Sequence, residues 1–93
     1  MTITRATVVG NGRNGFWGDG ALGPIDATIT DSTFTNHSVG FATITVNDAA
    51  RLVVSRNVVV DNGSFGLVQF TTSIVETAGG NVVRNNNGGG VQT

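Results

Sequence analysis

Three charged residues recur along the chain at nearly equal intervals: Arg5, Asp31 and Arg56. If they lie above one another, a carboxylate is held between two guanidinium groups. Such a face can take part in catalysis, or it can simply join stacked strands. Glu76 extends the alternation of charge under a looser alignment. We favour a structural ion ladder and keep a catalytic or ligand-binding face as the alternative.

The carboxylates of the chain argue against hydrolytic or calcium-dependent chemistry. Glycoside hydrolysis needs a close pair of carboxyl groups, and a calcium site needs several oxygen ligands. The six carboxylates are dispersed, with no two adjacent in the sequence: Asp19, Asp26, Asp31, Asp48, Asp61 and Glu76. We therefore assign no catalytic residue, no metal ligand and no cofactor from the sequence.

Trp17 is the one residue suited to stacking on a sugar ring. It follows Phe16 in a glycine-rich stretch, and strand alternation places Phe16 toward the core and Trp17 toward solvent. An exposed tryptophan suits a carbohydrate or a protein partner. We expect Trp17 to cover the first coil or to contact another subunit. A carbohydrate site at Trp17, or at the row of Arg5, Asp31 and Arg56, is the alternative.

The composition excludes several classes of function. Only 12% of residues are charged and the net charge is −1, so we expect neither nucleic-acid nor membrane-surface binding. No cysteine is present for a disulfide or a thiolate metal site. Gly10 to Gly15 matches a dinucleotide motif, but the segment that follows is too rich in glycine to form the helix that such a site needs.

The elements that must position these residues follow from a repeat of about 25 residues. Asparagine is followed four residues later by glycine in four places: Asn11 and Gly15, Asn36 and Gly40, Asn62 and Gly66, Asn86 and Gly90. Short alternating runs rich in Val, Ile, Thr and Phe flank each copy, as in half-buried strands. A fixed period of this length is typical of a solenoid.

The repeat predicts a fold in which each strand pairs with its equivalent one coil later. We expect an all-β parallel β-helix of about four coils in a single domain, residues 1–93. The coils cover roughly residues 1–26, 27–50, 51–73 and 74–93. The four Asn residues stack as an inward polar ladder, and the four Gly residues relieve the backbone where the chain re-enters a strand.

The same alignment predicts which side chains face inward. Counting two residues back from each Asn gives Val9, Phe34 and Val60 as core residues, with Arg84 in that place in the last coil. Four other valines are then expected to point outward: Val8, Val59, Val68 and Val83. Arg84 is interpreted as an incipient polar cap.

The segments Ile29 to Phe41 and Val54 to Leu67 resemble coils of right-handed parallel β-helix proteins of the pectate-lyase-like superfamily. The resemblance covers nearly the whole chain. It implies the fold, while members of the superfamily range from polysaccharide lyases and hydrolases to spacers without activity. In its lyases a basic residue abstracts the proton beside a carboxylate, so the resemblance implies a carbohydrate-active alternative.

Solenoid ends expose strand edges and the core behind them, so we expect a homo-oligomer joined through these ends or through apolar faces. The first expectation for function is a structural, self-assembling module without catalysis, alone or within a longer surface or secreted β-helix protein. The second is a carbohydrate-binding or polysaccharide lyase-like or hydrolase-like protein. Met1 to Arg5 contain no signal-peptide core, so we expect a soluble chain, although members of the superfamily are often extracellular.

Overall fold

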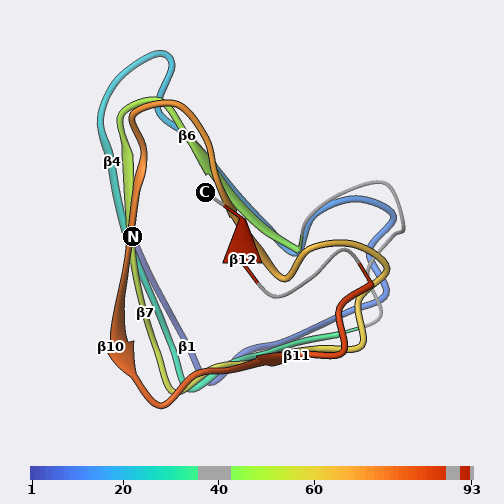
Figure 1. Cartoon of the computed structure of the whole chain (residues 1–93). Helices are drawn as coiled ribbons and strands as arrows, with labels where there is room; N and C mark the ends of the chain where they lie inside the picture. The colour runs from blue at the N-terminus through green and yellow to red at the C-terminus, as the bar shows by residue number, and fades with distance from the viewer. Residues whose placement is uncertain (36–42, 88–90, 93) are drawn as a thin grey trace.

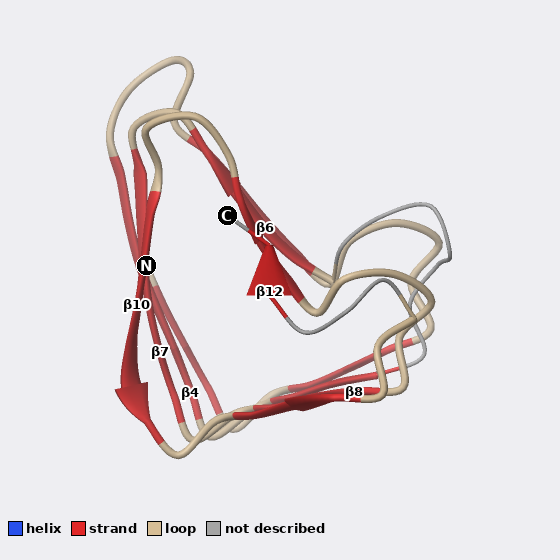
Figure 2. Ribbon diagram, viewed as in Figure 1, coloured by secondary structure: helices blue, strands red, loops and turns tan. Residues whose placement is uncertain are grey.

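The computed structural model describes residues 1–35, 43–87 and 91–92, and every regular element in them is a strand. Three parallel sheets form the walls of the solenoid (Figure 2). The first contains β1 (Thr2–Thr4), β4 (Ile25–Thr30), β7 (Ala50–Ser55) and β10 (Ile74–Gly79). The second contains β2 (Thr7–Val9), β5 (Thr33–Thr35), β8 (Val58–Val60) and β11 (Val82–Arg84). The third contains β3 (Phe16–Asp19), β6 (Ile44–Asn47), β9 (Leu67–Gln69) and β12 (Val91–Gln92).

The chain winds as a parallel β-solenoid, as the repeat predicts, with the right hand that the superfamily resemblance implies. In Figure 1, which looks along the axis, the chain passes through the three walls in turn and advances from the blue to the red end. Each sheet has four strands in the described residues, so the solenoid makes about three turns, slightly fewer than the four coils expected. Right-handed crossovers are the strong preference for parallel strands.

The core is a set of side-chain columns that run along the axis. In the second sheet, Val8, Phe34, Val59 and Val83 occupy successive positions of one column. Phe34 and Val59 in the middle are buried, whereas Val8 and Val83 at the two ends are half-buried. Burial therefore decreases from the middle of the solenoid toward both ends.

These columns correct the sequence-based assignment of faces in the second sheet. Val8, Val59 and Val83 face inward, and the outward column contains Val9, Thr35, Val60 and Arg84. Arg84 is exposed and does not cap the core. The alignment failed because Asn36 follows Phe34 by two residues, whereas Asn62 follows Val59 by three. A slip of one residue exchanges the two faces of a strand.

The third sheet holds one further difference. Val68 shares a column with Trp17 and Thr45, as an outward residue would, but it is only 2% exposed. Phe16 is buried and Trp17 is exposed, so the alternation predicted for this pair is confirmed.

Each coil has a corner that the repeat did not reveal. It lies between the first and second sheets, where Arg5, Asp31 and Arg56 have φ angles of 51°, 52° and 51°. These angles belong to the left-handed region, in which one residue turns the chain sharply. The three residues therefore form bends and are not strand positions.

Candidate functional site

The charged row of Arg5, Asp31 and Arg56 exists at this corner, along the outside of the solenoid. The Nε and second amino group of Arg56 donate to the two carboxylate oxygens of Asp31 at 2.8 and 3.0 Å. This hydrogen bonding lowers the pKa of Asp31, with smaller contributions from the charges of Arg56 and Arg5. All three side chains are exposed, and the row holds one surface ion pair, between Arg56 and Asp31, with the charge of Arg5 on the other side of Asp31.

Glu76 does not belong to this row, contrary to the looser alignment. It lies within β10 and accepts hydrogen bonds from Arg51 at 2.9 and 3.1 Å. The corner of the last coil is formed instead by Gly79 and Gly80, both with positive φ. The alignment failed because Ile74 pairs with Arg51 and not with Val54, which places Glu76 beside Val53, three residues before the corner at Arg56.

Trp17 lies on β3, the edge strand of the third sheet, and is 54% exposed. Its indole Nε1–H donates to the Asn47 carboxamide oxygen at 3.4 Å. The Arg13 guanidinium carbon lies 5.8 Å from the centroid of the indole ring, a cation–π distance. This cluster combines an aromatic face with an amide and a cation, which are groups that can contact a sugar.

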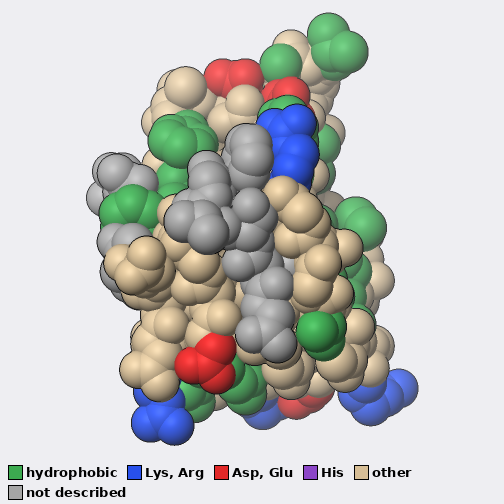
Figure 3. Space-filling model, turned by 90° about the vertical axis from the view of Figure 1, so that its right-hand side faces the viewer, with side chains coloured by type: hydrophobic (Ala, Val, Ile, Leu, Met, Phe, Trp, Pro, Cys, Tyr) green, Lys and Arg blue, Asp and Glu red, His purple; other side chains and the backbone are tan. Residues whose placement is uncertain are grey.

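The structure does not bring the two sequence-predicted sites together. Trp17 lies in the third sheet, whereas Arg5, Asp31 and Arg56 lie at the corner between the first and second sheets. Within the described residues, no three His, Cys, Asp or Glu side chains gather as metal ligands. The face in Figure 3 carries its charged side chains in a few separate places and shows no extended basic surface.

The predicted ladder is present at Asn62 and Asn86, which are both buried. The side-chain oxygen of Asn86 accepts from the backbone and side-chain nitrogens of Asn62 at 3.2 and 2.7 Å. The side-chain nitrogens of Asn62 and Asn86 donate to the carbonyls of Phe34 and Val59. Each ladder side chain therefore reaches back toward the preceding coil.

The other predicted ladder positions differ. Asn11 occupies the same column in the first coil but is exposed. Gly15 and Gly66 immediately precede β3 and β9, where the Gly15 amide donates to Thr43 and the Gly66 carbonyl accepts from Ile44. Three positions lie outside the described residues: Asn36, Gly40 and Gly90.

A second ladder, which sequence reasoning missed, fills the corner beside the charged row. The side-chain oxygen of Asn57 accepts from the amide of Ser32, and that of Asn81 accepts from the amide of Asn57, both at 3.0 Å. The signal was available, because Asn57 and Asn81 each precede a residue of the first ladder by five positions. Both corners thus combine a bend with an inward polar side chain.

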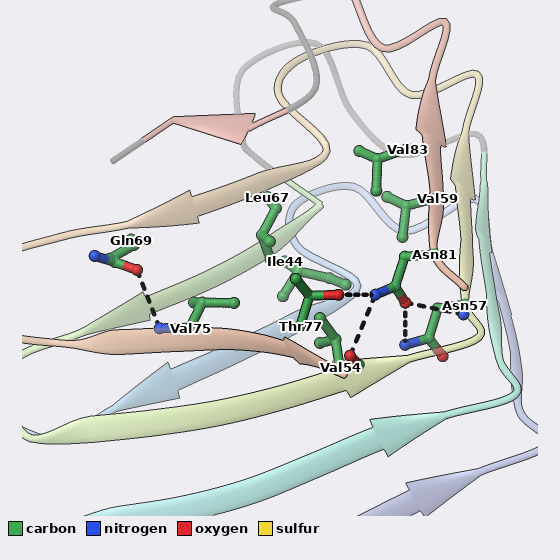
Figure 4. A pocket seen from close by; sticks show the side chains of 10 residues that line it. All are labelled: Ile44, Val54, Asn57, Val59, Leu67, Gln69, Val75, Thr77, Asn81 and Val83. Carbon is green, nitrogen blue, oxygen red and sulfur yellow. Dashed lines mark hydrogen bonds between the residues drawn. The ribbon is translucent and has the colours of Figure 1, made fainter. Parts of the chain in front are cut away.

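An apolar cavity of about 340 Å³ lies inside the last two coils (Figure 4). Its apolar lining is contributed by Ile44, Val54, Val59, Leu67, Val75 and Val83. Four polar side chains complete the wall, namely Asn57, Gln69, Thr77 and Asn81. Val75 and Val83 belong to the last coil and are only half-buried, so the core is incompletely covered at this end.

Comparison with known proteins finds no match among protein-family models, curated proteins or solved structures. None of the described residues belongs to a helix that could cross a membrane.

Proposed function

We propose that this chain is a structural, self-assembling β-helix module that associates through the ends of its solenoid and has no catalytic activity. On the resemblance of its coils, we also propose the pectate-lyase-like superfamily as its relative. The observation that carries the proposal is the incomplete covering of the core at both ends. Ile3 and Val8 in the first coil and Val75 and Val83 in the last pack on the core but stay half-buried.

The backbone at the two ends supports the same proposal. The edge strands β1, β2 and β3 have partners on one side only, as have β10, β11 and β12. Open edges of this kind are templates for pairing with another chain. Two amides of the last edge strand of the first sheet are met by side-chain oxygens, that of Val75 by Gln69 at 3.0 Å and that of Gly79 by Thr77 at 3.1 Å.

The proposal is tested by placing a charge at an open end. Val83→Lys puts an ammonium group beside the core of the last coil, where the long side chain can extend out of the open end. We expect sedimentation velocity to show that the variant associates only at protein concentrations at least tenfold higher than the wild type needs. Val58→Lys is the matched control, because Val58 is an exposed outward residue of the same sheet in a middle coil, away from both ends. Equal association of both variants, with the native circular dichroism spectrum, would exclude the ends as the contact.

The cluster at Trp17 supports carbohydrate binding as a second candidate function. An acidic polysaccharide fragment would stack on the indole and meet the Arg13 guanidinium. We expect nuclear magnetic resonance shifts around Trp17 with a millimolar uronic-acid oligosaccharide, and their loss in Trp17→Ala. Arg56→Ala tests the charged row separately, because Arg56 lies at a different corner. The absence of any shift at millimolar ligand would remove this candidate.

A further inference from the structure

Resting on the proposed self-assembly, we propose that copies stack head to tail, with the first coil of one copy on the last coil of the next, in one register. The occupant of each open end is thus the opposite end of a second copy. In this register Val8 of the incoming copy follows Val83, which continues the column of Val8, Phe34, Val59 and Val83. The incoming first coil then covers the cavity left open between the last two coils.

The direction of the asparagine ladder is the first argument for this polarity. Asn62 and Asn86 each direct the side-chain nitrogen to a carbonyl of the preceding coil, namely those of Phe34 and Val59. Asn11 holds the same column in the first coil and is exposed. In a head-to-tail stack, Asn11 of the incoming copy faces the Val83 carbonyl and the Asn86 amide. The first coil therefore carries the side chain that would continue the asparagine ladder of the last coil.

The second ladder behaves differently at the junction. Its place in the first coil is held by Ala6, whose amide donates to the Ser32 hydroxyl oxygen at 3.1 Å. The side chain of alanine has no hydrogen-bond acceptor for an amide of the last coil. Only the ladder of Asn62 and Asn86 therefore continues across the contact, which makes the corner at Asn11 the specific part of the interface.

The shape of the cross-section is the second argument. The walls are unequal, since β4, β7 and β10 have six residues each whereas β5, β8 and β11 have three. Successive coils follow a similar outline in Figure 2, so a copy stacked in the same sense brings each of the three sheets onto its own equivalent. In a two-fold contact between identical ends, the two chains run around the axis in opposite directions, so strands that meet across the contact are antiparallel. At most one wall then meets its own equivalent.

Disulfide cross-linking distinguishes these arrangements, because the chain has no cysteine of its own. Thr7 and Val82 are the exposed first and last members of one outward column of the second sheet. In a head-to-tail stack they lie about 4.8 Å apart across the contact, within the range for a disulfide. We expect a mixture of Thr7→Cys and Val82→Cys proteins to form the mixed dimer on oxidation, identified by intact mass.

The matched control shifts the register by two residues. Val9 lies on the same strand and the same face as Thr7, and in the stack it stands about 8 Å from Val82, too far for a disulfide. Val9→Cys should therefore cross-link to Val82→Cys at least tenfold less than Thr7→Cys does.

The outcomes separate this inference from the proposed function. Predominant dimers of Thr7→Cys with itself, or of Val82→Cys with itself, would overturn the head-to-tail polarity while leaving end-to-end assembly in place. Association without any of these cross-links would overturn the register and move the contact to the sides of the solenoid. A protein that stays monomeric at all concentrations would overturn both the polarity and the proposed function.

Discussion

At the scale of single residues, buried asparagines hold the corners of the solenoid. Asn57 is 1% exposed, and its side chain bonds the Ser32 amide, the Ile29 carbonyl and the Asn81 oxygen. Satisfying backbone groups at a bend is a task that a strand ladder cannot perform, because the bend interrupts the ladder. The stability of the molecule therefore depends on a few polar side chains as well as on its aliphatic columns.

Asn57→Ala is expected to lower the free energy of unfolding by about 3 kcal/mol, because it leaves buried backbone groups without a partner. Chemical denaturation measures the change. Asn87→Ala is the control, since Asn87 is exposed and its substitution should change stability by less than about 0.5 kcal/mol. Equal losses in the two variants would contradict the ladder as a stabilising element.

Arg56→Gln is expected to raise the pKa of Asp31 toward its ordinary value, because Arg56 supplies the hydrogen bonds that lower it. A carboxylate with a lowered pKa in the folded state stabilises the fold above its unfolded pKa, and this contribution is lost as the pH falls through the folded pKa. The stability difference between wild type and variant should therefore shrink in acid.

The measurement is a nuclear magnetic resonance titration of the Asp31 carboxyl carbon. Arg51→Gln is the control, because Arg51 pairs with Glu76 and not with Asp31. An unchanged Asp31 pKa in Arg56→Gln would show that the ion pair does not persist in solution.

Most individual residues of the candidate sites were predictable from the sequence, but their neighbours were not. The stacking of Arg5, Asp31 and Arg56 follows from spacing alone, as does the exposure of Trp17. Spacing carries no information on the left-handed backbone of Arg5, because arginine is an unusual residue for that conformation.

At the scale of elements, the path from the third sheet to the next coil depends on close backbone contact. Gly20 directly follows β3, and its amide donates to the Asn47 carbonyl at 3.1 Å. A Cβ atom at Gly20 would lie 2.5 Å from the backbone of Ala49 and Ala50. The coils can approach this closely only where no side chain stands between them.

Gly20→Ala is expected to destabilise the protein by about 2–3 kcal/mol, because a rigid backbone cannot move away from the added methyl group. Thermal unfolding followed by circular dichroism measures it. Gly12→Ala is the matched control, because a Cβ there meets no atom within 4 Å. A Gly20→Ala protein as stable as Gly12→Ala would contradict the tight approach of the first two coils.

The element pattern shows where sequence reasoning reaches its limit. Period-two alternation and the Asn spacing predict parallel strands stacked one coil apart, and the three sheets confirm this. The faces of Val8, Val59 and Val83 were wrong because the alignment assumed equal spacing from core residue to asparagine. Insertions of one residue at a bend do not alter the repeat length enough to be noticed, yet they exchange the faces of a strand.

At the scale of the whole molecule, a large share of the coils of a short solenoid are terminal coils. A terminal coil has a neighbour on one side only, and four core side chains of these coils stay partly accessible: Ile3, Val8, Val75 and Val83. A closed fold would cover these side chains with its own chain, whereas stacked copies cover them with each other. Head-to-tail stacking leaves one open end at each extremity, so it has no fixed number of subunits.

The most direct test of this account is the absolute mass in solution, measured by light scattering over a wide range of protein concentration. We predict an average mass that rises steadily with concentration and falls to that of a single chain, 9.5 kDa, only on strong dilution. A mass that stays at 9.5 kDa throughout the range would contradict assembly through the open ends.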